Sequence, residues 1–272
     1  MRIGRWGAIC LWVGLVAGCS SGRDTRWSQH VVEDRAAQSV VCIRTHERDD
    51  SAPIGLIQTD GALTSQAGGT GVLVGEDGLV LTNAHVLENV DQAVIVTRDG
   101  AAWPVRRWCT DDQSDLAILQ IDGDQMPALP LAAAEPDRHS GVFVVGYPPG
   151  EPRAAIRRGR VVRPVASLQA ELDPTGVVDY AHLIETTVQI EPGFSGGPMV
   201  DRRGRLLGLT VAMAECEGQT YGYALRFDQA TVERVQAMVE RIRLDEVWAS
   251  FGPLSVLGAV AEPATEPLIR LR

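Results

Sequence analysis

The chain has 272 residues, of which 45% are hydrophobic and 22% are charged, enough for a globular body of one large or two small domains. This composition excludes a chain that is disordered throughout, because such chains carry few apolar residues. The formal net charge is −10 at pH 7 and lysines and arginines form no run, so nucleic acid is not expected as a partner.

The N-terminal segment has the pattern of an export signal. Two arginines precede the apolar run 8–16, which is too short to span a bilayer comfortably but suits a signal peptide over residues 1–18. Residues 16–19, Val-Ala-Gly-Cys, resemble the bacterial lipobox, so we expect Cys19 to be lipidated and to anchor an exported lipoprotein in a membrane. Ser20 after this cysteine favours the outer membrane. The alternatives are an uncleaved anchor or an ordinary signal peptide cut nearby.

Residues 19–35 are expected to connect the lipid to the folded body. The segment 20–26 is small and polar, which is typical of a tether, and apolar residues within 27–36 have the spacing of a short helix. Further on, residues 46–68 carry Asp, Gly, Ser and Pro with little periodicity, and we interpret them as a long surface loop.

Short β-like runs separated by turn signals account for most of the remaining chain. In the first half, over about 39–121, the runs are 40–44, 71–74, 78–82, 93–97, 102–107 and 116–121. After the proline-containing linker 121–136, a second set over about 141–226 comprises 141–147, 154–165, 182–188, 197–200, 206–212 and 221–226. Six strands are enough to close a small barrel, so each half is expected to form one.

A helix is expected to close this domain. Asp228 is a good N-cap, and the apolar residues that follow it up to about residue 244 have helical spacing. The predicted fold is therefore all-β, with two six-stranded antiparallel barrels and a C-terminal helix over residues 36–244. Residues 245–272 are interpreted as a tail.

Residues 193–198, Gly-Phe-Ser-Gly-Gly-Pro, carry the strongest chemical signal. Small and rigid neighbours would expose Ser195 on a tight turn, and the N–H of Gly193 could turn inward beside that of Ser195 to form an oxyanion hole. A plain glycine-rich hairpin has the same composition, so this motif alone leaves both interpretations open.

Two further residues favour the catalytic interpretation. A serine hydroxyl needs a base to take its proton and a third group to orient that base. His85 lies where a strand passes into a helical turn, and Asp115 opens a buried strand. Asp111 and Asp112 are rivals as the acid, but they fall in a polar turn with no strand to fix them. The order His, Asp, Ser along the chain is that of chymotrypsin-like double barrels.

Four motifs occur in order at 69–74 (Gly-Thr-Gly-Val-Leu-Val), 81–86 (Leu-Thr-Asn-Ala-His-Val), 114–119 (Ser-Asp-Leu-Ala-Ile-Leu) and 192–198 (Pro-Gly-Phe-Ser-Gly-Gly-Pro). Together they resemble the protease domain of the bacterial HtrA/Deg family of trypsin-like serine proteases. The resemblance covers about residues 36–244 and implies that Ser195 is the nucleophile, His85 the general base and Asp115 its orienting acid. Members of that family commonly carry PDZ domains, for which the tail is too short, so the resemblance does not extend to substrate capture by such domains. It does not extend to trimer formation either, because the N-terminal segment has no clear aromatic cluster beyond Trp27.

The same resemblance implies a substrate pocket. Its walls would be formed by Gln189, Ile190, Glu191, Pro192, Thr210, Val211 and Ala212. Its presumed base, with Thr187 and Gln189, has no acidic residue, so we expect a modest apolar pocket and cleavage after small or medium aliphatic residues. Phe194 stands where HtrA-like enzymes usually have Asn, and we expect it to pack under the active-site turn.

Neither a metal nor another cofactor is expected. The histidines other than His85 lack metal-ligand spacing and are interpreted as surface or structural residues; they are His30, His46, His139 and His182. With the signal peptide and its Cys10 removed and Cys19 lipidated, three of the five cysteines remain, which permits at most one internal disulfide. Cys42 and Cys109 lie in the same predicted barrel and are the candidate pair in an oxidising setting.

Three functions are compatible with these patterns. They are a membrane-tethered serine endopeptidase acting on proteins or peptides, a catalytically silent double barrel used as a binding scaffold, and a structural lipoprotein of the envelope. The first is favoured, because a decayed scaffold has no reason to retain His85, Asp115, Ser195 and Gly193 together.

Overall fold

The computed structural model of the chain describes residues 30, 32–47, 67–172, 176–216, 218–244 and 269–270. The expected signal peptide, the lipidated Cys19, most of the loop 46–68 and most of the tail lie outside these residues. Of the helix expected within 27–36, the structure describes a short π-helix, η1 (Val32–Ala36). Within the described ranges, no helix has the length and apolar character needed to cross a membrane.

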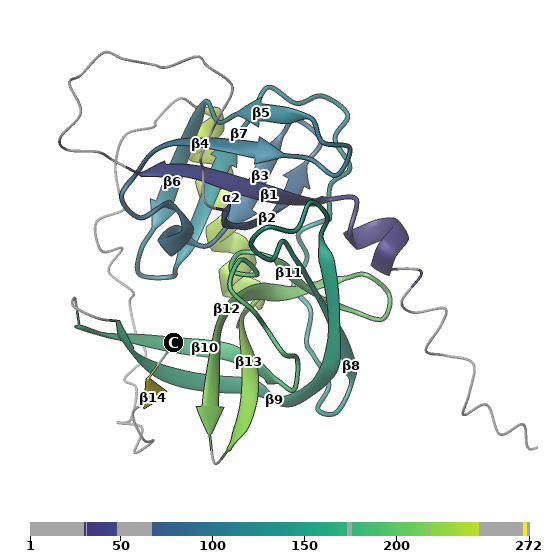
Figure 1. The fold of residues 1–272 in the computed structure, drawn as a ribbon, viewed down its shortest axis with the longest axis vertical. Helices are drawn as coiled ribbons and strands as arrows, with labels where there is room; N and C mark the ends of the chain where they lie inside the picture. The colour runs from purple at the N-terminus through teal and green to yellow at the C-terminus, as the bar shows by residue number, and fades with distance from the viewer. Residues whose placement is uncertain are drawn as a thin grey trace, which may run out of the picture.

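The first half of the chain is a curved antiparallel sheet in the order β5-β4-β1-β2-β3-β7-β6 (Figure 1). Its strands are β1 (Val40–Glu47), β2 (Ala67–Gly75), β3 (Leu79–Thr82), β4 (Val90–Val96), β5 (Ala102–Pro104), β6 (Arg107–Asp111) and β7 (Leu116–Gln120). The strand expected over 102–107 is instead the edge strand β5 followed by a bend and the first residue of the other edge strand, β6, which continues to Asp111. This stretch bends at Val105 and Arg106, whose N–H groups donate to the carbonyls of Ala93 and Gln120 on opposite sides. The two sides of this bend therefore pair with different strands, β5 with β4 and β6 with β7.

The second half closes into a six-stranded barrel, because β9 pairs with β10 as well as with β8. Its strands are β8 (Gly141–Gly146), β9 (Ala155–Leu172), β10 (Gly176–Thr186), β11 (Pro198–Asp201), β12 (Leu206–Cys216) and β13 (Gln219–Arg226), and β14 (Ile269–Arg270) adds to β9 in parallel. β9 and β10 are longer than expected, because residues 168–172 and 176–180 pair with each other beyond the apolar runs that marked the strands.

Both faces of the central strands of the first half, β1, β2, β3 and β7, are largely buried, whereas β4 and β5 have exposed positions. Residues such as Val41, Leu73 and Leu119 form the core inside this half. Their neighbours Val40 and Leu81 point the other way and join a cluster shared with the second half and the C-terminal helix. Strands covered on both faces produce the continuous apolar runs seen in the sequence, where a half-exposed sheet would alternate. The expected all-β, trypsin-like double-barrel fold is confirmed, with one difference: the second half closes into a six-stranded barrel, whereas the first half is a seven-stranded half-barrel whose edge strands β5 and β6 do not pair with each other.

The helix α2 (Gln229–Arg243) follows the second barrel and returns to the first half, seen in yellow-green in Figure 1. Its N-cap is Asp228, whose side chain accepts a hydrogen bond from the N–H of Thr231 at 2.9 Å. Its apolar stripe is buried in the shared cluster and consists of Val232, Val235, Met238, Val239 and Ile242. Arg234 on the same helix forms an ion pair with Asp111 at the end of β6, at 2.7 Å. The helix therefore helps to hold the two halves together.

Candidate active site

His85 lies directly after β3 in the short 3-10 helix η2 (Ala84–Leu87), as the sequence predicted. The following residues Val86 and Leu87 are buried in the core of the first half. This anchoring leaves the imidazole of His85 directed outward, with 34% of the side chain exposed. The ring can therefore meet both a partner within the protein and a group from solvent.

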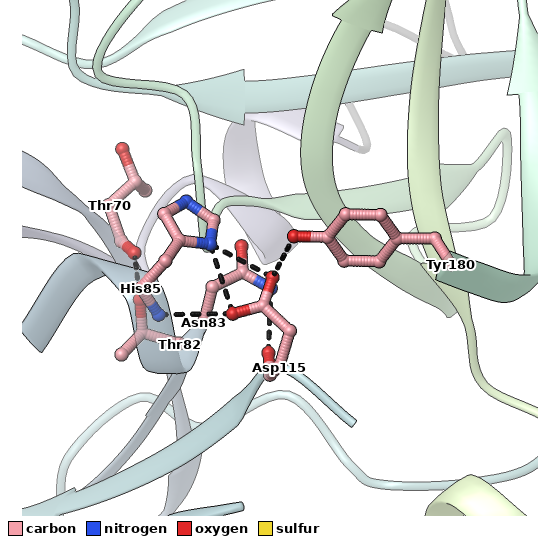
Figure 2. A network of polar contacts seen from close by, with 6 residues as sticks. All are labelled: Thr70, Thr82, Asn83, His85, Asp115 and Tyr180. Carbon is pink, nitrogen blue, oxygen red and sulfur yellow. Dashed lines mark hydrogen bonds and ion pairs between the residues drawn. The ribbon is translucent and has the colours of Figure 1, made fainter. Parts of the chain in front are cut away.

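Asp115 precedes β7 and has φ of 50°, a left-handed conformation that is uncommon for a residue other than glycine. Asn83 stabilises it, because its Nδ2 donates to the Asp115 carbonyl at 3.0 Å. The carboxylate accepts the backbone N–H of His85 at Oδ1, at 3.0 Å, and the Nδ1 atom of His85 lies 2.9 Å from Oδ2 (Figure 2). The structure thus brings together the residues expected to be base and orienting acid.

The carboxylate also sets the charge state of the imidazole. Burial by itself lowers the pKa of His85, but the hydrogen bond to Asp115, the charge of Asp115 and the charge of Glu88 together raise it above the ordinary histidine value. In the neutral ring, a proton on Nδ1 is donated to the carboxylate and Nε2 remains free to accept a proton. This is the tautomer that a general base requires.

The two rival carboxylates lie away from His85. Asp111 is the last residue of β6 and not part of a polar turn as expected; its side chain is buried in the ion pair with Arg234. Asp112 is exposed in the turn that follows. Neither hydrogen-bonds to His85 among the described residues, so Asp115 is the acid that the geometry favours.

Ser195 lies in the loop between β10 and β11. The N–H of Phe194 donates to the carbonyl of Glu191 at 3.2 Å, and Gly193 has φ of 88°. With Pro192 at the second position, these features define a type II turn, in which the third residue needs a positive φ. A Cβ atom on Gly193 would lie 2.2 Å from a backbone oxygen, so no other residue fits there without a shift.

A threonine of the first half holds this turn. The N–H of Thr70 on β2 donates to the Ser195 carbonyl at 2.9 Å, and its hydroxyl donates to the Gly193 carbonyl at 2.6 Å. The same hydroxyl accepts the N–H of Tyr147 at 2.9 Å, and the Thr70 carbonyl accepts the hydroxyl of Thr82 at 2.7 Å (Figure 2). Thr70 therefore fixes the turn of the second half relative to β2 and β3 of the first.

The two expected oxyanion donors are adjacent on this turn. In the part of the chain that the structure describes, the N–H groups of Gly193 and Ser195 have no acceptor, which leaves them available to an incoming oxygen. Val86, the neighbour of His85, and the Ser195 carbonyl both lie against Gly69, within 3.1 Å of where its Cβ would be. The serine turn and η2 are thus close, although no described contact joins Ser195 Oγ to the imidazole.

Phe194 packs under the turn, as predicted. It is fully buried in the core of the second half, and its ring lies so close to Gly146 that a Cβ there would be 2.5 Å from it. The guanidinium of Arg157 on β9 lies 5.6 Å from the centre of the ring and also forms an ion pair with Glu191 at 2.8 Å. Arg157 thereby contacts both ends of the type II turn.

Some of the expected pocket residues are exposed at the surface, and the others are buried or partly buried. Thr187 and Gln189 are exposed, and Gln189 Nε2 donates to the Thr220 carbonyl at 3.3 Å, so this amide lies along the outer wall. Ile190 is buried beside Gly222, where an added Cβ would be 2.4 Å from its side chain. Of the other expected residues, Thr210 and Val211 are buried, Ala212 is partly buried, and Glu191 and Pro192 are exposed.

The candidate disulfide is not formed: Cys42 and Cys109 are both free, buried thiols. Cys42 lies on β1 and Cys109 on β6, and β2, β3 and β7 separate these strands in the sheet. Placing both cysteines in one barrel therefore did not bring them within reach of each other. Burial raises the pKa of both thiols, that of Cys109 to about 11, so they stay protonated at neutral pH. No group of potential metal ligands occurs in the described ranges.

Three residues of this site were not recognised from the sequence. Thr70 and Asn83 lie inside the motifs, but the contacts of Thr70 with the serine turn depend on the pairing of the two halves, and that of Asn83 with Asp115 depends on the pairing of β3 with β7. Tyr180 on β10, whose hydroxyl lies 3.3 Å from Asp115 Oδ2, belongs to no motif at all. An isolated tyrosine in a polar segment gives no signal, because its partner is 65 residues away in the chain.

A half-barrel that carries the pair of His85 and Asp115, together with a closed barrel that carries the Ser195 turn, is the arrangement of the trypsin-like double-barrel class. The profile of the trypsin-like peptidase domain matches residues 69–209, half of the chain. The chain belongs to this family.

The chain is also similar to relatives that are named DegP-like. The chain is 31% identical over 166 residues to a protein of Halomonas elongata and 32% identical over 170 residues to one of Pseudomonas fluorescens, both named "probable periplasmic serine endoprotease DegP-like". The alignments cover 60% and 61% of this chain but only 33% and 34% of those relatives, so the chain spans about a third of their length.

Solved structures agree with this placement. A structure of the HtrA-type protease AlgW with a tripeptide superposes with a TM-score of 0.61 and 26% identity, over 79% of this chain and 64% of that chain. The resemblance to HtrA/Deg proteases is confirmed.

Proposed function

We propose that the chain is a serine endopeptidase that hydrolyses peptide bonds with His85, Asp115 and Ser195 as its triad and is anchored in the cell envelope through Cys19. The observation that carries this proposal is the hydrogen-bonded pair of His85 and Asp115 beside the turn that presents Ser195. The relatives are named serine endoproteases, which supports the same chemistry.

Each step of the reaction has a candidate group. His85 Nε2 takes the proton of Ser195 Oγ as this oxygen attacks the carbonyl carbon of the scissile peptide bond. The N–H groups of Gly193 and Ser195 donate to the oxyanion that develops. The imidazolium then gives its proton to the leaving amine, and an acyl-enzyme remains. Water, deprotonated by His85, attacks the acyl carbon and releases Ser195.

The pocket is proposed to accept small or medium aliphatic side chains. The buried side chain of Ile190 fills the space beside Gly222 and so leaves less of the pocket open to a long substrate side chain. The one acidic residue among the expected wall residues, Glu191, is paired with Arg157, so a lysine or arginine of a substrate would lack a free counter-charge there.

The proposed location is the periplasmic side of the bacterial envelope. The relatives are named periplasmic, which agrees with an export signal at residues 1–18. The lipobox-like sequence before Cys19 and the serine after it favour a lipoprotein of the outer membrane.

A fluorophosphonate probe tests the proposal, because it labels only a serine whose hydroxyl is activated. The full chain is treated with the probe beside two matched variants, Ser195→Ala and Ser140→Ala, the latter at a partly exposed serine that precedes β8. Labelling of the wild type and of Ser140→Ala, with none of Ser195→Ala, is the expected result. Hydrolysis of an unfolded protein by the same three samples should follow the same pattern.

The alternative function gives a different outcome. If the double barrel is a catalytically silent scaffold, the folded wild type reacts no faster than Ser195→Ala and releases no peptides. That result would overturn the peptidase proposal, provided that circular dichroism shows the wild type to be folded.

A further inference from the structure

Tyr180 reaches the candidate triad from the opposite half of the molecule. It lies on β10 in the second barrel, and its hydroxyl is 3.3 Å from Oδ2 of Asp115 in the first half (Figure 2). Its ring is half-buried and packs against the apolar cluster that the two halves share. This packing holds the ring of Tyr180 in place and so fixes the position of its hydroxyl beside Asp115.

The hydroxyl acts as the donor in this contact. Burial, together with the charge of Asp115 and the hydrogen bond to it, raises the pKa of Tyr180 well above its ordinary value, so the phenol keeps its proton throughout the neutral range. Asp115 Oδ1 already accepts the backbone N–H of His85, and Oδ2 faces Tyr180. In the described ranges, Tyr180 supplies the only hydroxyl that is donated to this carboxylate.

We propose that Tyr180 is a positioning residue of the triad: its hydroxyl holds the Asp115 carboxylate in the orientation that places His85 for catalysis. The proposal rests on the peptidase function proposed above. His85 Nδ1 lies 3.0 and 2.9 Å from the two carboxylate oxygens; in addition, the backbone N–H of His85 donates to Oδ1 and Tyr180 donates to Oδ2, so that rotation of the carboxylate about its own axis is opposed at both ends. The chemistry at His85 thereby depends on the position of β10.

The hydrogen bond also has an electrostatic effect on the imidazole. A donor to a carboxylate withdraws part of its negative charge, so Asp115 without Tyr180 would favour the charged form of His85 more strongly. The charged groups that act on His85 are Asp115 and Glu88. Glu88 has no described contact with Tyr180, so its effect should not change when the phenol hydroxyl is removed. Loss of this hydroxyl is expected to raise the pKa of His85.

The kinetic test compares Tyr180→Phe with Tyr223→Phe. Tyr223 is a matched control, because its hydroxyl donates to another buried carboxylate, Glu185, at 3.2 Å, and that carboxylate does not contact the candidate triad. For Tyr180→Phe we expect kcat for a peptide substrate to fall roughly tenfold with KM nearly unchanged, the lower end of what one hydrogen bond to a charged group contributes. The acid limb of its pH profile should move to higher pH. Tyr223→Phe should keep the wild-type kcat and pH profile.

A second measurement does not require turnover. In a Ser195→Ala background, NMR titration of ring-labelled histidine gives the pKa of His85 with and without Tyr180→Phe. A higher pKa in the double variant supports the proposal. An unchanged pKa, together with wild-type kinetics of Tyr180→Phe, would overturn it.

The two proposals fail in distinguishable ways. If the wild type itself neither hydrolyses peptides nor reacts with fluorophosphonate, the peptidase function is wrong, whereas an active wild type with an unaffected Tyr180→Phe contradicts only the role of Tyr180. Circular dichroism melts of all variants show whether a loss of rate comes from unfolding.

Discussion

The two halves of the molecule contribute to the candidate active site in different ways. The first half joins His85 and Asp115 by side-chain hydrogen bonds, and the backbone of each residue is fixed next to β3 or β7. The second half presents Ser195 on a turn with no described side-chain bond to His85. The shape of that turn depends on the backbone of Gly193, on contacts from Arg157 in the second half, and on Thr70, which reaches it from β2 in the first half.

Because of this difference, the protonation state of His85 and the geometry of the serine turn should respond to different substitutions. Substitutions at the pair of Asp115 and His85, or at groups that contact this pair, should act on the charge state and tautomer of His85. Substitutions around the serine turn should instead change how well the N–H groups of Gly193 and Ser195 point at an oxyanion, without altering the titration of His85. The predictions below test whether these two kinds of effect can be separated.

The largest effect is expected for Asp115→Asn. The asparagine amide favours the wrong imidazole tautomer, so kcat for a peptide substrate should fall about 10⁴-fold while the fold is retained. Steady-state hydrolysis measured together with a thermal melt checks this. Residual activity within tenfold of the wild type would contradict the assignment of Asp115.

A nearby carboxylate provides the control. Asp111→Asn removes the charge partner of Arg234 between β6 and α2, so it should lower the free energy of unfolding by about 2 kcal/mol. The kcat of the folded fraction should stay at the wild-type value, because Asp111 does not contact His85. Opposite outcomes for the two variants would show that the wrong aspartate was chosen.

Among residues that contact the serine turn, Thr70 on β2 is expected to give the next largest effect when it is changed to Val. This change removes the hydroxyl that holds the Gly193 carbonyl, so the turn can tilt its N–H away from the oxyanion position, and kcat should fall about tenfold or more. The pH dependence of the reaction should not move. A shifted acid limb would show that Thr70 acts on His85 instead.

Thr186→Val is a close match for this change. The Thr186 hydroxyl donates to the Gly222 carbonyl and accepts the N–H of Val188, the same pattern as at Thr70, and it is equally buried. Both variants leave buried backbone groups unpaired and should lose similar stability, of about 1–3 kcal/mol. Only Thr70→Val should lose rate, since Thr186 does not touch the serine turn.

Much of the fold could be predicted from the sequence, because both faces of many strands are buried and produce uninterrupted apolar runs. The errors lie where hydrogen bonding between distant segments decides the structure. The stretch from 102 to 111 was expected to hold one strand but divides into β5 and β6, since each part pairs with a different neighbour. The extension of β9 and β10 likewise depends on their pairing with each other.

The candidate site was predictable to the extent that it is carried by local motifs. His85, Asp115 and Ser195 each stand in a short sequence with a clear structural role. Thr70, Arg157 and Tyr180 contribute through contacts with residues far away in the chain, for which no periodicity or turn signal exists. The pairing of Cys42 with Cys109 was wrong for the same reason, since a shared barrel does not fix a distance.

The pH dependence of labelling by fluorophosphonate tests the role of the first half, which sets the charge state of His85. Because the pKa of His85 is raised, the midpoint of the acid limb should lie above the ordinary histidine value of about 6.5, with a tenfold loss of rate per pH unit below it. The stability of the fold should depend on pH in the opposite direction to the labelling rate. The pair of His85⁺ with Asp115 stabilises the fold fully at low pH and less as pH rises through the raised pKa. The melting temperature of wild type should therefore exceed that of His85→Gln by more at pH 5 than at pH 9.

The smallest effect is expected at Arg157, which contacts the serine turn through Phe194 and Glu191. The ion pair with Glu191 is about one third to one half exposed, and such pairs contribute little on their own, while a cation over an aromatic ring adds a similar amount. Arg157→Leu should thus lower the rate of fluorophosphonate labelling only about threefold and leave the pH midpoint in place.

Arg158→Leu is the control for this last variant, because Arg158 is the next residue on β9, is exposed, and forms no ion pair among the described residues. The Arg157 effect should shrink as salt is added, since screening weakens the exposed pair in the wild type as well. A loss of rate that persisted at high salt would assign the contribution to the packing of the guanidinium on Phe194. An equal loss in Arg158→Leu would instead mean that the positive charge of β9, and not its contact with the turn, affects the reaction.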